Sequence, residues 1–227
     1  MQMRKLNYAI FATIFALTLS SAALSESESE SESAIDTALL SSIAQLQKGW
    51  AEVNYQSQGD QQLEEFAVLL ERATALVDAN PQAAPAYIWR GIIESTYAGA
   101  KGGLGALKFA KAAKADLEKA LELEPEAMSG SAYTSLGTLY FNVPGWPIAF
   151  GSDKKAQALL TKALTLNPDG IDSNYFYASF MRSQGRDEEA RNFFLKAQRA
   201  APRADRPLAD AGRQKEISEA LAALDAK

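Results

Sequence analysis

A recurring pattern of small and large side chains constrains the fold of this chain more than any other feature. Three segments carry a small, a large and a second small residue and then proline, with internal spacings of four, three and five residues. They are Ala113–Leu117–Ala120–Pro125, Ala156–Leu160–Ala163–Pro168 and Ala190–Phe194–Ala197–Pro202. Apolar residues at this spacing share one face of an α-helix, small residues let helices approach closely, and proline ends the helix. Because the last two copies are 34 residues apart, we expect a stack of helical repeats.

The rest of the body extends this pattern in both directions. The small position of the first helix in each pair is held by Gly91, Gly137 and Ala178. Residues 36–56 and 61–79 are predicted to form one further amphipathic pair. A last helix over residues 208–224 is predicted to cap the array, with Arg213, Lys215, Glu216 and Glu219 toward solvent. The expected fold, over residues 34–227, is all-α: about four antiparallel helix pairs and a C-terminal capping helix, wound into a right-handed superhelix.

This spacing of small residues and prolines resembles the tetratricopeptide repeat. In that family ligand contacts come mainly from the first helix of each unit, so the resemblance implies a concave groove. The positions carried over are Ile88, Ile92 and Ser95, then Thr134, Thr138, Phe141 and Asn142, and finally Tyr175, Ser179 and Arg182. This set is neutral and partly aromatic, with Arg182 as its one cation. It suits a peptide segment or a small organic ligand better than a highly acidic tail.

Two units depart from the regular repeat by insertions. Gly137 and Ala156 are 19 residues apart, where the last unit has 12 between the matching positions, and the extra residues include Val143–Ser152, VPGWPIAFGS. Two prolines prevent a helix here and stiffen the loop. Two hypotheses follow: Trp146 and Phe150 both plug the adjoining repeats, or Trp146 is a partly exposed anchor for a partner.

The second insertion lengthens the Gly91–Ala113 interval to 22 residues and is rich in glycine over Tyr97–Lys108. Its lysines are Lys101, Lys108, Lys111 and Lys114. Backbone N–H groups of Gly102 and Gly103 could meet an anion at a helix N-terminus. The segment lacks the Lys–Ser/Thr ending of a phosphate-binding loop, so we favour a flexible loop and an extended helix with solvated lysines.

The N-terminus carries the pattern of an export signal. Arg4 and Lys5 precede the apolar run Tyr8–Leu19, and small residues follow. Residues 1–25 are therefore predicted to be a cleavable secretory signal peptide, with an uncleaved anchor as the alternative. Alternating Ser and Glu over residues 26–33 predict a disordered spacer. With no Cys in the chain, we expect an exported, periplasmic protein that is not a lipoprotein.

Composition excludes several classes of function. The chain of 227 residues has no His and no Cys, which removes Ser–His–Asp and Cys–His catalysis and the common zinc sites. Its net charge of −5 argues against nucleic acid, which requires a basic surface. The acidic residues Asp169, Asp172, Glu188 and Glu189 fall at helix starts, where carboxylates favour the helix dipole. We therefore expect no enzymatic activity, no cofactor and no metal.

Several segments also resemble the T component of TRAP transporters, exported helical-repeat proteins thought to meet a substrate-binding protein. They are GSAYTSLGTLY, PGWPIAFG, KAQALLTKALTLNPDG and NYFYASF. The resemblance implies a non-enzymatic adaptor that binds a protein partner through the groove and the Pro-Gly-Trp-Pro loop. The chain departs from that family in lacking a lipidation Cys. The alternative function is a small-molecule module of the cell envelope that binds organic acids.

Overall fold

The computed structural model describes residues 37–226. The chain divides into two units, Met1–Ser41 and Ser42–Lys227. In the first unit only residues 37–41 are described, and they are helical. The predicted signal peptide and the Ser/Glu spacer lie outside the described residues. Everything that follows concerns the second unit.

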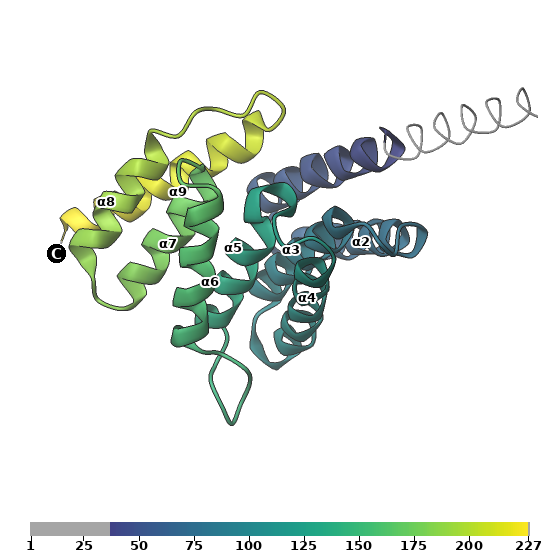
Figure 1. Ribbon diagram of the computed structural model, residues 1–227, viewed down its shortest axis with the longest axis horizontal. Helices are drawn as coiled ribbons and strands as arrows, with labels where there is room; N and C mark the ends of the chain where they lie inside the picture. Colours follow the sequence, from purple (N-terminus) through teal and green to yellow (C-terminus); the bar gives the residue numbers. More distant parts are fainter. Residues whose placement is uncertain (1–36, 227) are drawn as a thin grey trace, which may run out of the picture. The chain divides into compact units, whose positions relative to one another are not determined.

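The second unit is built from antiparallel helix pairs that stack in chain order (Figure 1). Residues 42–56 are helical and are followed by the helices with printed bounds. These are α2 (Gly59–Ala79), α3 (Ala84–Lys101), α4 (Gly103–Leu123), α5 (Ala127–Asn142), α6 (Asp153–Leu166), α7 (Ile171–Ser183), α8 (Asp187–Gln198) and α9 (Pro207–Asp225). The predicted all-α architecture of four pairs and a capping helix is confirmed for the residues that the structure describes.

The small residues of the repeat pattern bring the helices of each pair into close contact. Ala113, Ala156 and Ala190 are fully buried. At Gly91 a Cβ atom would lie 2.8 Å from Leu117 Cγ, and at Gly137 it would lie 2.7 Å from Leu160 Cγ. Real Cβ atoms do not approach neighbours so closely, so glycine is required wherever the facing side chain is a leucine. The repeat spacing thus encodes the interlocking of α3 with α4 and of α5 with α6.

The glycine-rich insertion lengthens two helices and leaves almost no loop. Helix α3 continues to Lys101 and α4 begins at Gly103, so that Gly102 alone separates them. Gly102 has φ +61° and Gly103 has φ +62°, values that favour glycine over other residues. The expected flexible loop is therefore wrong for this segment, whereas the expected extension of the helix is correct.

The Val143–Ser152 segment forms a projecting loop whose two aromatic side chains behave differently (Figure 1). The backbone N–H of Gly151 donates to the Pro144 oxygen at 2.9 Å, which closes the base of the loop. Phe150 is half-buried and packs edge-to-face on Tyr140, with ring centroids 5.5 Å apart. Trp146 at the tip is 90% exposed. Of the two aromatic side chains, only Phe150 packs against the adjoining repeats, whereas Trp146 projects into solvent.

The capping helix α9 reaches back to the first helix of the second unit. A Cβ atom at Gly212 would lie 2.5 Å from the ring of Tyr55, so the backbone of α9 rests directly on that ring. The predicted solvent-facing side of this helix is wrong at one position, because Arg213 is buried. Its guanidinium lies over the rings of Tyr175 and Phe176, at 4.3 Å and 4.5 Å from their centroids. Aromatic faces and nearby carboxylates thus offset the burial of this charge.

Candidate ligand-binding groove

The first helices of the repeats line a groove of about 1250 Å³. Its lining comes from α3, α4, α5 and α7, from residues 42–56, from loop residues 143, 144 and 148, and from the segment that runs from Ala201 into α9. A volume of this size exceeds the roughly 300–1,000 Å³ of common small-molecule pockets. The groove is thus large enough for an extended segment of polypeptide or for an elongated organic molecule.

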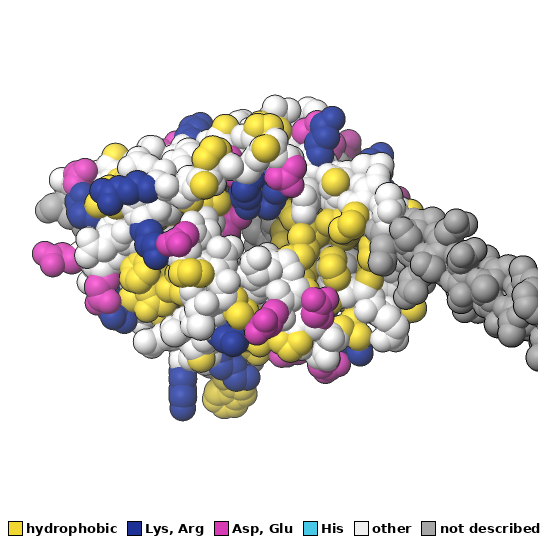
Figure 2. Space-filling model, turned by 45° about the horizontal axis from the view of Figure 1, so that its top comes forward, with side chains coloured by type: hydrophobic (Ala, Val, Ile, Leu, Met, Phe, Trp, Pro, Cys, Tyr) yellow, Lys and Arg dark blue, Asp and Glu magenta, His cyan; other side chains and the backbone are white. Residues whose placement is uncertain are grey.

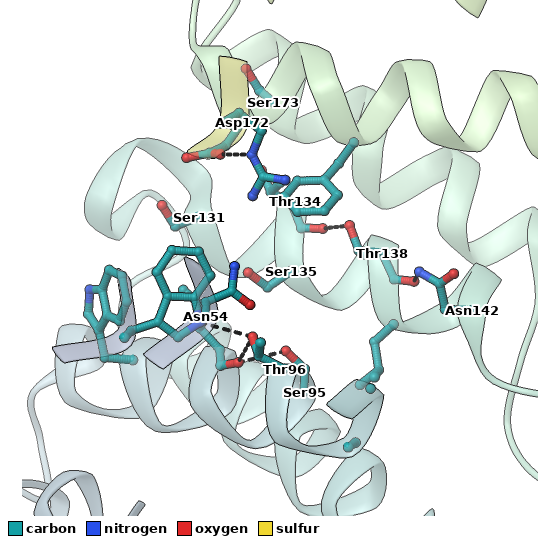
Figure 3. Close-up of a pocket in the computed structure, with 18 of the residues that line it drawn as sticks. Asn54, Ser95, Thr96, Ser131, Thr134, Ser135, Thr138, Asn142, Asp172 and Ser173 are labelled. Atoms are coloured by element: carbon teal, nitrogen blue, oxygen red, sulfur yellow. Dashed lines mark hydrogen bonds and ion pairs between the residues drawn. The ribbon is translucent and has the colours of Figure 1, made fainter. Parts of the chain in front are cut away.

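Hydroxyl and amide side chains form a polar row along the groove (Figure 3). Ser95 and Thr138 donate their hydroxyl protons to backbone oxygens of their own helices, at 2.9 Å and 2.8 Å. The Asn142 amide nitrogen donates in the same way to the Thr138 oxygen at 3.0 Å. Because the protons are used within the helix, the side-chain oxygens keep lone pairs that can accept from a ligand. The row therefore matches a ligand that offers N–H or O–H donors.

A strained turn lies beside this row, at the start of α5. Met128, Ser129 and Gly130 have φ values of +50°, +54° and +76°, which makes one turn of left-handed backbone. This conformation costs about 1–2 kcal/mol for each residue that has a Cβ. Gly130 packs against Leu166, and the Ser131 hydroxyl donates to the Met128 oxygen at 2.8 Å. Met128 and Ser129 line the groove, so the strain is located at its wall.

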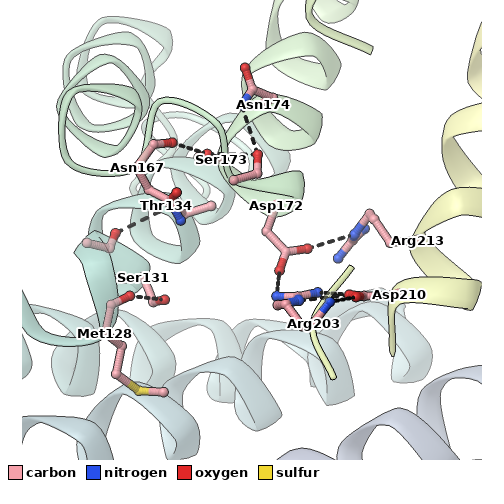
Figure 4. Close-up of polar contacts among 12 residues, drawn as sticks. Met128, Ser131, Thr134, Asn167, Asp172, Ser173, Asn174, Arg203, Asp210 and Arg213 are labelled. Carbon is pink, nitrogen blue, oxygen red and sulfur yellow. Dashed lines mark hydrogen bonds and ion pairs between the residues drawn. The ribbon is translucent and has the colours of Figure 1, made fainter. Parts of the chain in front are cut away.

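One end of the groove carries a network of partly buried ion pairs (Figure 4). Asp172 accepts from Arg203 at 2.8 Å and from Arg213 at 2.9 Å, and Arg203 also pairs with Asp210 at 2.5 Å. Burial alone would raise the pKa of the Asp172 carboxyl, but the charges of Arg213 and Arg203 outweigh this effect and lower the pKa to about 2. The network joins the start of α7 to α9 and to the segment between α8 and α9.

Arg206 lies close to this network, but within residues 37–226 no carboxylate forms an ion pair with it. Its guanidinium lies 5.2 Å from the ring centroid of Trp89, and its Nε atom is buried without a hydrogen-bond partner. Burial, and next the charge of Arg203, lower the pKa of Arg206. Trp89 is itself buried with an unpaired indole N–H, and it meets Trp50 edge-to-face at 6.2 Å. All three side chains line the groove, so this part of the lining combines aromatic surface with a guanidinium that forms no ion pair with a described residue.

Of the residues predicted to bind a partner, three line the groove. They are Ile92, Thr138 and Asn142. Ser95 and Thr134 from the wider set of expected positions join them. Their role in binding stays a prediction. Trp146 lies outside the groove, at the tip of its loop.

The other predicted positions require correction. Ile88 is fully buried in the core, because the groove face of α3 passes through Trp89 and Ile92. Phe141 packs on Phe180, with ring centroids 5.6 Å apart, and lies outside the groove lining. Phe150 lies at the base of its loop and packs on Tyr140. Each side chain meets apolar partners that a single-helix pattern does not reveal.

Helix α7 shows the largest difference between predicted and observed register. Tyr175 packs on Phe194 at 5.7 Å and under Arg213, and Arg182 lies exposed 5.8 Å from the Phe194 ring, so neither lines the groove. Asp172, Ser173 and Phe176 occupy the groove face in their place. The groove-lining residues of α7 therefore lie about one helical turn before the expected ones.

Sequence reasoning missed the two tryptophans Trp50 and Trp89 and the cation Arg206. Trp50 lies in the pair whose spacing departs from the repeat, and Arg206 lies after the last repeat, so the repeat pattern assigns neither a position. In the described part of the chain, no group of three or more His, Cys, Asp or Glu side chains could hold a metal ion. Over the same residues, every helix is too short or too polar to cross a membrane.

Comparison with known proteins supports the fold. The crystal structure of TTC0263, a thermophilic TPR protein in Thermus thermophilus, matches with a TM-score of 0.54 and 21% identity, over 71% of this chain and 76% of that chain. The chain has a tetratricopeptide-type fold. Two structures of MamA match at TM-scores of 0.43 and 0.41, with 18% and 16% identity, over 75% and 79% of this chain and 94% and 90% of theirs. No protein-family model and no curated protein sequence matches the chain.

Proposed function

We propose that this protein is an exported, non-enzymatic adaptor that holds an extended segment of a partner protein in its groove. Following the resemblance of its sequence to the TRAP-transporter T components, we propose a periplasmic substrate-binding protein as the partner. Loop 143–152 is proposed to be a second contact surface, which adjoins the groove where Val143, Pro144 and Ile148 line it. The polar row of α3 and α5 is the observation that carries the assignment of the groove.

An extended polypeptide presents backbone N–H groups along its length, and each requires an acceptor when it leaves water. The oxygens of Ser95, Thr138 and Asn142 supply acceptors along the groove. Aromatic and aliphatic residues on either side, such as Trp50 and Leu107, can cover the side chains of the segment. This combination of polar row and apolar flanks is typical of peptide recognition in a preformed groove.

A substitution that fills the groove tests this proposal. Ser135 lies half-buried in the polar row (Figure 3), so Ser135→Tyr should obstruct the groove. Ser218→Tyr, at an exposed position of α9, is the matched control. In pull-downs from periplasmic extract followed by calorimetry on the recovered protein, we expect Ser135→Tyr to weaken binding at least tenfold. Equal affinity of the two variants would show that the partner does not use the groove.

Arg206 favours a second candidate function, the binding of a small organic acid. Its guanidinium lines the groove without an ion pair to any described residue, and a carboxylate could accept from it while the rest of the ligand lies along the groove. We expect millimolar carboxylates to raise the Tm of the wild type, and Arg206→Met to abolish the increase. The control is Arg199→Met, an exposed arginine outside the groove lining. A carboxylate-dependent increase that survives in Arg206→Met would contradict this assignment.

A further inference from the structure

Large exposed hydrophobic side chains gather at one end of the second unit. Trp146 is 90% exposed, Leu104 87% and Ile148 64%. The only other large hydrophobic residue with high exposure in the described part of the unit is Val68 of α2, at 49%. Trp146 and Ile148 belong to the projecting loop, and Leu104 lies at the start of α4.

The loop and the α3–α4 turn are neighbours. Val143 and Phe150, at the two ends of the loop, pack against the cluster that also holds Ala106 and Phe109 of α4. The Lys114 ammonium lies 5.9 Å from the Phe150 ring centroid. Both segments lie at the lower edge of the molecule in Figure 1. We call this end, formed by residues 97–114 and 143–155, the lysine–tryptophan end.

The charge of the lysine–tryptophan end is opposite to that of the whole chain. Its two segments hold six lysines, no arginine and a single acidic residue, Asp153, which gives five net positive charges, whereas the chain carries −5. Lys101, Lys108, Lys111 and Lys154 are exposed and form no ion pair with any residue between 37 and 226. Figure 2 shows hydrophobic and basic side chains together on the projection at the lower edge. The distribution is therefore a local basic patch with apolar side chains at its tip.

We propose that the lysine–tryptophan end docks on an anionic lipid surface. The apolar side chains stand at the tip and the ammonium groups stand behind them, which is the order that a bilayer presents: an interfacial zone that accepts tryptophan and a layer of phosphate groups that attracts lysine. An apolar contact and a polybasic patch together supply the two signals that stable peripheral binding requires.

The choice of lysine argues for lipid over an acidic protein surface. Protein interfaces are enriched in arginine and depleted of lysine, since the planar guanidinium pairs with carboxylates in two hydrogen bonds. This chain has arginines available, and it places Arg203, Arg206 and Arg213 in the lining of the groove, away from the lysine–tryptophan end. A compact ammonium group, which acts as a point charge on phosphates, suits a fluid lipid surface without a fixed geometry.

A dye at a single site tests the proposal in the full chain. Because the sequence has no cysteine, Ile148→Cys can be labelled at this one position with the environment-sensitive dye NBD; position 148 lies in the loop, where it borders the groove. Val68→Cys, labelled in the same way, is the control at the other exposed apolar position. With vesicles of POPC and POPG at 7:3, we expect the fluorescence at position 148 to rise severalfold and shift to the blue, with little change at position 68. Pure POPC should give a much weaker response.

The charge dependence is tested in the labelled Ile148→Cys background. Lys108→Gln with Lys154→Gln should weaken partitioning roughly fivefold for each lysine, while Lys162→Gln with Lys215→Gln should have a smaller effect. The groove-filling Ser135→Tyr should leave vesicle binding intact, so failure of this proposal and failure of the groove proposal are distinguishable. Three results would each overturn the proposal: no change in NBD fluorescence at position 148, an equal change at position 68, or equal binding to pure POPC. A response to a purified acidic protein but not to vesicles would assign this end to a protein partner.

Discussion

The carboxyl groups of Asp172 and Glu94 show how neighbouring charges decide protonation in this molecule. Asp172 has two arginine partners, and its pKa is lowered despite burial. Glu94 of α3 is only 7% exposed, and its Oε2 atom has no hydrogen-bond partner among the described residues. Arg90, which could have neutralised it, is held by Asp116 of α4 at 2.5 Å and 2.7 Å. Burial, and next the negative charge of Asp116, raise the pKa of Glu94 to about 8.

We predict that Glu94→Gln stabilises the protein at alkaline pH. A carboxyl whose pKa is raised on folding binds its proton more tightly in the folded state, so its contribution to the free energy of unfolding is fullest below about pH 4.5 and falls as the pH rises toward 8. Glutamine mimics the protonated form. Urea denaturation should therefore show that Glu94→Gln gains about 2–4 kcal/mol relative to wild type between pH 5 and pH 9.

The control for this prediction is Glu64→Gln, the same substitution at an exposed position of α2. A difference between Glu94→Gln and wild type that is the same at pH 5 and pH 9 would mean that Glu94 is ionised throughout. In that case Arg90 would have to reach both carboxylates in solution.

At the scale of the element, the sequence predicted the helices and their pairing but not all of their faces. Positions such as Ala156 and Gly137 were predictable because the side chain that fits there is fixed by contact with one neighbouring helix. The groove face of α7 was not, because it also depends on α9, which lies outside the repeat. Arg213 illustrates this: a charged residue on a terminal helix is ordinarily solvated, and only the rings of Tyr175 and Phe176 make its burial favourable.

The left-handed turn at Met128–Gly130 could not be predicted from the sequence either. Gly130 alone suggests a positive φ, whereas Met128 and Ser129 are ordinary helix residues by propensity. Gly130 also meets Leu166 of α6, a contact between helices that the local sequence does not reveal. The exposed Trp146 was left open between two hypotheses for a similar reason, since the proline-rich sequence fixes the stiffness of the loop but not the direction of its tip.

At the scale of the whole second unit, one contact between distant parts of the chain confines the groove. The α9 backbone at Gly212 rests on Tyr55, whose hydroxyl group is buried and unpaired within the described residues; burial raises the pKa of this hydroxyl to about 12. Through this contact the C-terminal helix and residues 42–56 support one another across the groove. The ion pairs of Arg203 and Arg213 with Asp172 reinforce it from the side of α7.

Substitution of Gly212 by alanine tests this closure, because two effects of opposite sign compete there. Alanine stabilises an ordinary helix position by roughly 0.5–1 kcal/mol relative to glycine. A Cβ 2.5 Å from the rigid Tyr55 ring costs roughly 1–3 kcal/mol through overpacking. We therefore expect Gly212→Ala to be destabilising in urea denaturation and to raise amide hydrogen exchange in residues 42–56 and in α9. Gly99→Ala in α3, where nothing lies within 4 Å of the new Cβ, should be stabilising. If both variants are stabilised alike, α9 does not rest on Tyr55 in solution, and the groove is open on that side.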